Sequence, residues 1–220
     1  MKRLLPFLAM TLFVFSCTTD SYEKGEGKYS LMRGDFAEVK VNADRQIVSF
    51  VTDDGEQYAL TEPYTEKWIK TPDTLYRCML YYNKVENQKA EIVSIGEVPC
   101  PRIKTLAELK KELRTDPVKF ESMWLSKSRK YLNFYLQLKT GVTDDTTAIQ
   151  QLAFISDTLV MNPNQTTTRY IILYHDQNRV PEYYSTKAYV CLLTDSIGAD
   201  SIRISINTYS GQVTKSLPVR

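Results

Sequence analysis

The sequence predicts a mainly β fold: a small OB-like β-barrel followed by an Ig-like antiparallel β-sandwich, with one short linking helix. Three observations support this prediction. Many short segments alternate apolar and polar residues with the two-residue period of a half-buried strand. Turn-forming pairs such as Asp54-Gly55 separate these segments. A Pro-Cys-Pro sequence at residues 99–101 then interrupts the strands, because neither proline can donate a hydrogen bond to a strand ladder.

The barrel prediction covers residues 31–100. Ala37, Val39 and Val41 alternate with charged residues, as expected for a strand with one buried face. The segments "QIVSFV" and "EQYAL" then flank Asp54-Gly55, a pair typical of hairpin turns. The segments "TLYRCMLYYN" and "AEIVSIGEV" complete a set of about five short strands, which favours a small barrel of the OB type.

Residues 101–117 are predicted to be a linker that contains the short helix. Thr105 and Glu108 have the spacing of a capping box, in which each side chain bonds to the backbone of the other residue. Three leucines follow helical spacing. They are Leu106, Leu109 and Leu113.

The sandwich prediction covers residues 118–220. Seven or so short strands separated by turn signals, including Ser210-Gly211, favour two packed antiparallel sheets. Three groups of residues are each predicted to share one face of a strand. They are Val118, Phe120 and Trp124; Leu132, Phe134, Leu136 and Leu138; and Ile202, Ile204 and Ile206.

The first residues have the layout of a secretory signal peptide. Lys2 and Arg3 precede an apolar run at residues 4–15 that is too short to cross a bilayer. The sequence "VFSC" at the end of this run resembles the lipobox of bacterial lipoproteins. We therefore expect residues 1–16 to be a lipoprotein signal peptide and Cys17 to carry acyl chains. The alternative is an ordinary signal peptide with an incidental cysteine.

Residues 17–30 lack apolar periodicity and are predicted to be a flexible tether. The lipidated N-terminus would hold the chain to a membrane, since several acyl chains together make detachment negligible. The expected location is the cell envelope, as an outer membrane lipoprotein that faces the periplasm or the cell surface. No other segment of the sequence is apolar enough to span a bilayer.

The charge of the sequence argues against nucleic acid as a partner. The chain has 28 Lys and Arg residues and 26 Asp and Glu residues, and loss of Lys2 and Arg3 with the signal peptide leaves equal numbers. Proteins that bind DNA or RNA have a basic excess, because phosphate contacts supply most of their affinity.

Beyond Cys17 the sequence contains Cys78, Cys100 and Cys191, an odd number, so at least one thiol has no partner within the chain. Buried free thiols are the preferred interpretation. If a disulfide forms, Cys78 with Cys100 is the candidate pair. The sequence contains no CxxC and no Cys/His spacing, so we expect neither a metal site nor a cofactor.

The single histidine, His175, would have to serve any catalytic triad or metal site. Asp176 beside it points to the opposite side if the strand continues. We interpret His175 as a strand-end residue held by turn hydrogen bonds, and not as a catalytic group. Asp53 and Asp54 are adjacent carboxylates without further spaced ligands, which does not make a calcium loop.

Several segments, taken in order and spacing, resemble one known family over nearly the whole mature chain. They are the lipobox-like start, "GDFAEVKV" with "DDG", the strand pair "WLSKSRKYLNFYLQL" and the stretch "YHDQNRVPEYYSTKAYV". The family is that of the NigD-like lipoproteins. The resemblance implies an N-terminal OB-like domain, a C-terminal β-sandwich and an association with a bacteriocin locus. It implies no catalytic residues.

Three functions remain open at this stage. A non-catalytic binding or accessory module, for an envelope protein or another envelope component, is favoured over an enzyme because the sequence lacks a phosphate loop, a GxSxG elbow and metal-ligand spacing. The alternative is glycan binding by the barrel, with Tyr64 and Trp68 stacking on sugar, unless these rings merely plug the barrel end. A hydrolase with paired carboxylates is less favoured, because no carboxylate has a distinctly apolar setting.

Overall fold

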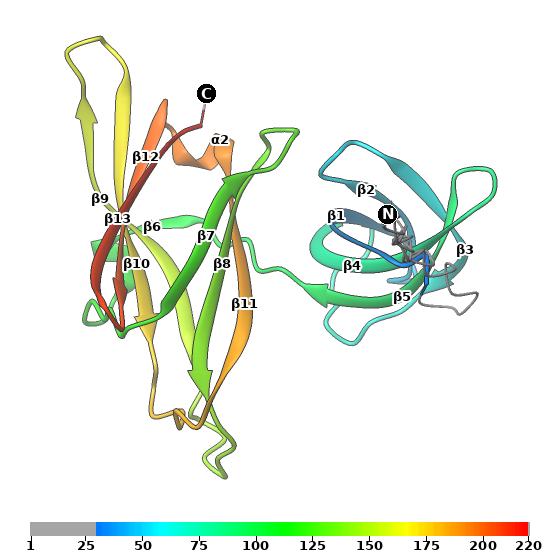
Figure 1. Cartoon of the computed structure of the whole chain (residues 1–220), viewed down its shortest axis with the longest axis horizontal. Coiled ribbons are helices and arrows are strands. Elements are labelled where there is room, and N and C mark those ends of the chain that lie inside the picture. The colour runs from blue at the N-terminus through cyan, green and yellow to red at the C-terminus, as the bar shows by residue number, and fades with distance from the viewer. Residues whose placement is uncertain (1–29, 220) are drawn as a thin grey trace, which may run out of the picture.

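The computed structural model describes residues 30–219, which form a barrel and a sandwich joined by one connecting segment, residues 98–102 (Figure 1). The barrel strands are β1 (Arg33–Val41), β2 (Ile47–Thr52), β3 (Gln57–Tyr64), β4 (Leu75–Val85) and β5 (Lys89–Glu97). The other strands are β6 (Ile103–Thr105), β7 (Lys119–Leu125), β8 (Tyr131–Thr140), β9 (Gln151–Met161), β10 (Thr167–Asp176), β11 (Tyr184–Leu193), β12 (Ser201–Thr208) and β13 (Gly211–Pro218). The two helices are α1 (Leu106–Leu109) and α2 (Thr194–Ile197).

The barrel closes in the strand order β1-β2-β3-β5-β4, and β4 pairs back onto β1. The pair β3 with β5 is parallel, and the other barrel pairs are antiparallel. This order, with its single parallel pair, is that of an OB-type barrel. The predicted mainly β fold with a small barrel is therefore confirmed.

The interior of the barrel follows the predicted alternation. Ala37, Val39 and Val41 on β1 are buried together with Phe50 of β2. The hairpin predicted at Asp54-Gly55 joins β2 to β3, and Gly55 takes the positive φ of 84° that the turn requires. Its amide donates a hydrogen bond of 2.9 Å to the carbonyl oxygen of Thr52.

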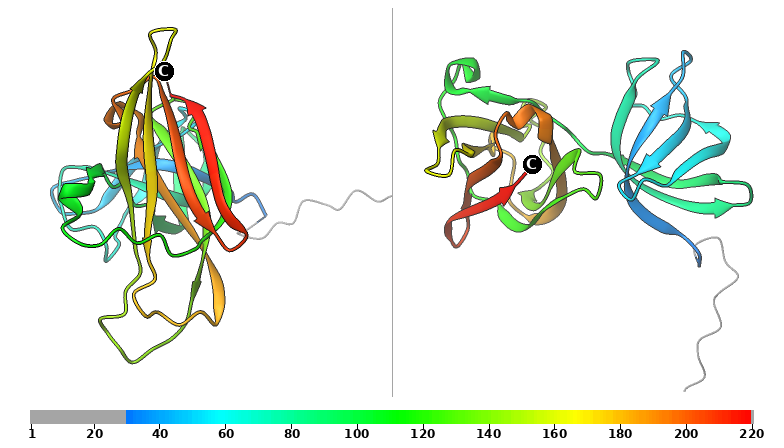
Figure 2. Two further views of the ribbon diagram at one scale, coloured as in Figure 1. Left: turned by 90° about the vertical axis from the view of Figure 1, so that its left-hand side faces the viewer. Right: turned by 90° about the horizontal axis from the view of Figure 1, so that it is seen from above.

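The sandwich consists of a five-stranded sheet in the order β13-β12-β10-β9-β6 and a three-stranded sheet in the order β11-β8-β7. In Figure 1 the three-stranded sheet lies on the side of the barrel, and the view from above in Figure 2 shows the two units next to each other. The sequence predicts antiparallel pairing throughout. Two pairs differ from that prediction, because β10 with β12 and β6 with β9 are parallel.

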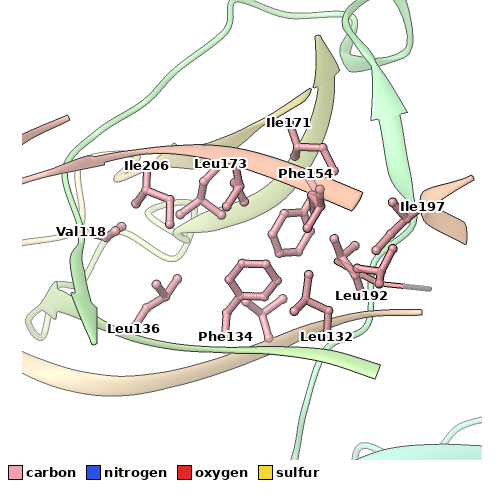
Figure 3. Packing of buried hydrophobic residues seen from close by; sticks show 14 of the residues in the cluster. Val118, Leu132, Phe134, Leu136, Phe154, Ile171, Leu173, Leu192, Ile197 and Ile206 are labelled. Carbon is pink, nitrogen blue, oxygen red and sulfur yellow. The ribbon is translucent and has the colours of Figure 1, made fainter. Parts of the chain in front are cut away.

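The sandwich core lies between its two sheets (Figure 3). Phe134 of β8 and Phe154 of β9 meet across this core with ring centroids 4.9 Å apart. Two of the three groups predicted to share a face are confirmed, since all their members are buried in this cluster. They are Leu132, Phe134, Leu136 and Leu138, and Ile202, Ile204 and Ile206.

The third predicted group is wrong, because β7 contains a bulge. Its register with β8 shifts between Phe120 and Ser122, which reverses the alternation of side chains beyond that point. Val118 and Phe120 therefore belong to the sandwich core, whereas Trp124 packs against Phe36 of the barrel.

The region predicted as a linker contributes a strand to the sandwich. Residues 103–105 form β6, which pairs with β9 in the five-stranded sheet. The capping box at the start of α1 is confirmed, since Thr105 and Glu108 bond to each other's backbone. The helix ends after one turn because Lys110 takes a left-handed conformation with φ 54°. The second helix, α2, has no counterpart in the sequence prediction.

Candidate functional site at the junction of the two domains

The barrel and the three-stranded sheet of the sandwich meet through the outward faces of their strands. Phe36 on β1 and Arg77 and Met79 on β4 alternate with residues that point into the barrel. On the sandwich side, Tyr131 and Asn133 of β8 point away from the sandwich core and toward the barrel. We define these contacts between the two faces as the junction.

Arg77 is the central polar group of the junction. Its guanidinium donates two hydrogen bonds, of 2.6 and 2.7 Å, to the carboxylate of Asp53 in the β2–β3 turn. Its Nη2 also donates a hydrogen bond of 3.0 Å to Oδ1 of Asn133. Arg77 and Asp53 belong to the barrel and Asn133 to the sandwich, so one guanidinium links the two domains.

Burial and charge act in opposite directions on Arg77, whose side chain is only 3% exposed. Burial alone would lower its pKa, but the hydrogen bonds to Asp53 and the charge of that carboxylate outweigh burial and raise the pKa. The guanidinium also lies 4.1 Å from the ring centroid of Tyr131 and 5.3 Å from that of Phe36. These rings supply cation–π attraction where water has been excluded.

A second polar link lies beside the first. The hydroxyl of Tyr131 and Nζ of Lys130 both donate to Oε1 of Glu38 on β1, with the lysine at 2.6 Å. Burial and the bond to Glu38 raise the pKa of Tyr131. Two neighbouring polar links, together with edge-to-face contacts of Phe36 with Trp124 and Tyr189, therefore fix the orientation of the sandwich relative to the barrel.

A groove of about 850 Å³ runs beside the junction. Tyr81 of β4 and Ile95 of β5 form its barrel wall, and Leu138 of β8 and Tyr189 of β11 form its sandwich wall. The connecting segment, including Pro101, completes the lining. The lining is mostly apolar, which suits a ligand or peptide with apolar side chains.

The edge of β11 borders this groove. In the three-stranded sheet β11 is paired with β8 on one side only. Toward the groove, the amide of Cys191 donates a hydrogen bond of 2.9 Å to the carbonyl oxygen of Pro99. Alternate residues of a strand direct their amides to the same side, so Tyr189 and Lys187 present theirs to the groove. Pro99 thus makes the first hydrogen bond of a strand pairing with β11, and the residues next to Pro99 do not extend this pairing along the edge.

The three cysteines of the described region are free thiols, as the sequence analysis preferred. Cys78 points into the barrel core, and its thiol donates to the carbonyl oxygen of Ala37. Cys100 instead packs in the cluster that contains Cys191. The alternative pairing of Cys78 with Cys100 is therefore wrong, because the thiol beside Cys100 is that of Cys191.

Tyr64 and Trp68, the candidate glycan-stacking residues, are only partly exposed and pack against the barrel core. The ring of Trp68 meets that of Tyr76 edge to face, with centroids 5.5 Å apart. They lie outside the groove. Cys17, the predicted lipidation site, lies outside the described residues.

His175 is buried near the end of β10. Its Nδ1 donates to the carbonyl oxygen of Asp116 at 3.0 Å, and its backbone exchanges hydrogen bonds with Arg114 and Asp116. Neither a hydroxyl nor a carboxylate within residues 30–219 bonds to its ring in the manner of a triad.

Sequence analysis did not single out Arg77, Asn133 or Tyr189 as site residues. An arginine within the apolar stretch of β4 was the available signal, but its partners lie 24 and 56 positions away in the sequence. Local alternation assigns Asn133 to the polar face of β8 without indicating that this face is covered.

Two global features of the described residues bear on the site. No group of three or more His, Cys, Asp or Glu side chains in residues 30–219 is placed to hold a metal ion. The helices within that part of the chain are too short and too polar to span a membrane.

Comparison with known proteins gives the family. The model of the NigD-like C-terminal beta sandwich domain matches residues 102–218. The chain belongs to the NigD-like family. A NigD-like immunity protein from Bacteroides caccae is 25% identical, with a TM-score of 0.64 over 83% of this chain and 91% of that one. No curated protein matches the chain.

Two more distant crystal structures share the fold. A protein of unknown function from Bacteroides vulgatus is 14% identical, with a TM-score of 0.63 over 85% of this chain and 90% of that one. A candidate lipoprotein from Bacteroides fragilis is 11% identical, with a TM-score of 0.55 over 84% of this chain and 96% of that one. These likenesses span both domains, so the pairing of barrel and sandwich recurs in other proteins.

Proposed function

We propose that this NigD-like protein is a membrane-anchored lipoprotein of the cell envelope that binds a partner protein without transforming it chemically. The observation that carries the proposal is the groove between the barrel and the open edge of β11. Its walls belong to different domains, and the bonds of Arg77 to Asp53 and Asn133 hold those walls in place. A groove held open in advance requires little ordering when a ligand enters.

The proposed occupant is an extended segment of an envelope protein, which adds to β11 as a further strand. Main-chain amides of Lys187 and Tyr189 face the groove, and the first pairing on this edge is already made by Pro99. An added strand would gain affinity from main-chain hydrogen bonds and specificity from apolar side chains set against Tyr81 and Ile95.

A non-catalytic role is supported by the chemistry of the groove. Glu97 is the only carboxylate among the residues that line the groove, Lys187 is the only lysine, and the lining contains no histidine. The immunity protein from Bacteroides caccae agrees with an accessory role of this kind. A carboxylate-based hydrolase is disfavoured, because the groove has a single carboxylate where a glycosidase uses two.

The anchor is proposed to be Cys17, with the chain on the outer membrane and facing the periplasm or the cell surface. The relative from Bacteroides fragilis agrees in being a candidate lipoprotein. A full chain with Cys17→Ser should pass from the membrane fraction to the soluble fraction. If mass spectrometry of the parent chain finds an unmodified amino terminus beyond residue 17, the proposal that Cys17 is the lipid anchor is contradicted.

Crosslinking in intact cells tests the binding site. A photoreactive benzoylphenylalanine at Tyr81, which is 38% exposed in the groove, should capture one defined envelope protein. The same group at Tyr209, which is 42% exposed and outside the groove, should not capture it. Equal capture at both positions, or an adduct only with glycan, would contradict the proposal.

The mode of binding is tested at Lys187, because its amide faces the groove and not β8. Lys187→Pro removes that donor, whereas Lys187→Ala removes only the charge. If the partner adds as a strand, the yield of the crosslinked adduct at Tyr81 should fall at least about tenfold in the proline variant, because one main-chain hydrogen bond is lost and the proline ring clashes with the added strand. The alanine variant should retain it. Equal behaviour of the two variants would exclude strand addition.

A further inference from the structure

Two thiols lie together where the connecting segment meets the sandwich, and neither the core of the barrel nor that of the sandwich contains them. Cys100 stands between Pro99 and Pro101 and lines the groove. Cys191 is fully buried on the barrel-facing side of β11. The hydrogen bond from the amide of Cys191 to the carbonyl oxygen of Pro99 holds the two backbones side by side at 2.9 Å.

We propose that Cys100 and Cys191 are a redox-active pair that closes to an intramolecular disulfide. The bond fastens the connecting segment to the edge of β11 and so fixes one wall of the groove. This inference goes beyond partner binding, since the pair responds to oxidants whether or not the groove holds a peptide. Disulfides persist outside the cytoplasm, where oxidising conditions prevail.

The surroundings assign different roles to the two thiols. Interaction with the neighbouring Cys191 thiol lowers the pKa of Cys100 against the opposing effect of burial. The same interaction, together with burial, raises the pKa of Cys191. The nearby Arg77 guanidinium favours thiolate at both positions. Cys100 lines the groove and is only partly buried, whereas Cys191 is fully buried, so an oxidant in solution reaches Cys100 first. Cys100 is therefore the attacking thiol, and Cys191 is the resolving one.

The reaction is a thiol–disulfide exchange with a disulfide as oxidant. Cys100 Sγ, as the thiolate, bonds to one sulfur of the oxidant, whose sulfur–sulfur bond breaks and releases one thiolate. Cys191 Sγ, after losing its proton, then bonds to Cys100 Sγ and releases the second thiolate. Both leaving groups take up the protons given by the cysteines. Two protein thiols are oxidised, and one disulfide is reduced to two thiols.

Cys78 supplies an internal control. Its thiol is fully buried inside the barrel and bonded to the carbonyl oxygen of Ala37. Burial raises the pKa of Cys78 to about 12, which leaves almost no thiolate at neutral pH. An oxidant that acts through solvent should therefore leave Cys78 reduced.

The test uses the full chain with Cys17→Ser, so that residue 17 contributes no thiol, and oxidised glutathione as the probe. After alkylation with N-ethylmaleimide, mass spectrometry should find that three free thiols fall to one, with a peptide linking Cys100 to Cys191. The oxidised chain should melt several degrees higher than the reduced one, because the new bond closes a long loop. Dithiothreitol should reverse both changes.

Single variants test the order of attack. With Cys191→Ser, the glutathione adduct should accumulate on Cys100. With Cys100→Ser, the chain should stay unmodified, because Cys191 is buried. Each of three results would overturn the proposal. The parent chain could keep three free thiols after oxidation, it could form a disulfide that includes Cys78, or its glutathione adduct on Cys100 could persist without forming the disulfide to Cys191. Peptide mapping of the parent decides the matter even where a variant folds poorly.

Discussion

The sandwich core and the junction are both buried, but they are stabilised by different kinds of contact. In the core, Phe134 and Phe154 pack against each other among aliphatic side chains, and the energy comes from burial of apolar surface. In the junction, Arg77 occupies the central position and is held by a carboxylate, an amide and two aromatic rings.

This difference in contacts means that the core and the junction tolerate substitution differently. An apolar core tolerates exchange of one hydrophobic residue for another of similar volume, because its contacts are non-directional. A buried guanidinium requires acceptors at fixed positions, since an unpaired buried charge is costly. The junction therefore specifies one orientation of the barrel against the sandwich, whereas the core specifies only that the two sheets pack.

The largest expected effect is that of a cavity in the sandwich core. Phe134→Ala should lower the free energy of unfolding by about 4 kcal/mol, because a fully buried ring is removed and its neighbours relax only partly. Phe134→Leu, the matched control, should cost about 1 kcal/mol. Denaturant titration followed by circular dichroism measures both. A loss for the alanine variant no greater than for the leucine variant would contradict a tightly packed core.

Loss of the buried charge should come next. Arg77→Ala should cost about 3 kcal/mol, because Asp53 loses its charged partner at a partly buried site and keeps only the longer hydrogen bond from Asn133. Lys84→Ala, which breaks the exposed pair with Glu56 on the same barrel, should cost less than about 1 kcal/mol. If the two variants lose equal stability, the junction is no more than a surface contact.

Arg77→Ala should also uncouple the unfolding of the barrel from that of the sandwich. The parent chain is expected to unfold in one transition, and Arg77→Ala in two, because the barrel and the sandwich each retain their own core. Adding Asp53→Asn should recover part of the loss, since the uncompensated carboxylate is then removed. A double-mutant cycle with coupling near zero would show that the two side chains act independently.

This contrast also explains which features the sequence could predict. Alternation identified the apolar residues of two strands as core, because strand period and burial are local properties. They are the alternate residues from Leu132 to Leu138 and from Ile202 to Ile206. The Asp54-Gly55 hairpin and the cap of α1 were predictable for the same reason. Each depends on residues within a few positions of one another.

The junction could not be predicted in this way. Trp124 was assigned to the wrong face because the bulge between Phe120 and Ser122 leaves no mark in the pattern of apolar residues. The nearness of Cys100 to Cys191 depends on where the connecting segment crosses β11. Such contacts are set by how two finished domains dock, and a strand's outward face carries no local sign of the surface that will cover it.

The smallest expected effect lies at the rim of the junction, at Lys130. This side chain is 46% exposed and bonds to Glu38, which also accepts from Tyr131. Lys130→Met should therefore cost only about 0.5 kcal/mol, because Glu38 keeps one partner and water replaces the other.

Salt should separate the rim from the buried centre. The cost of Lys130→Met should vanish between low and high salt, since exposed pairs are screened, whereas the cost of Arg77→Ala should change little. Thermal unfolding of both variants at two ionic strengths measures this. If the two costs respond equally to salt, the guanidinium of Arg77 is reached by solvent ions, and the contrast between an open rim and a closed centre does not hold.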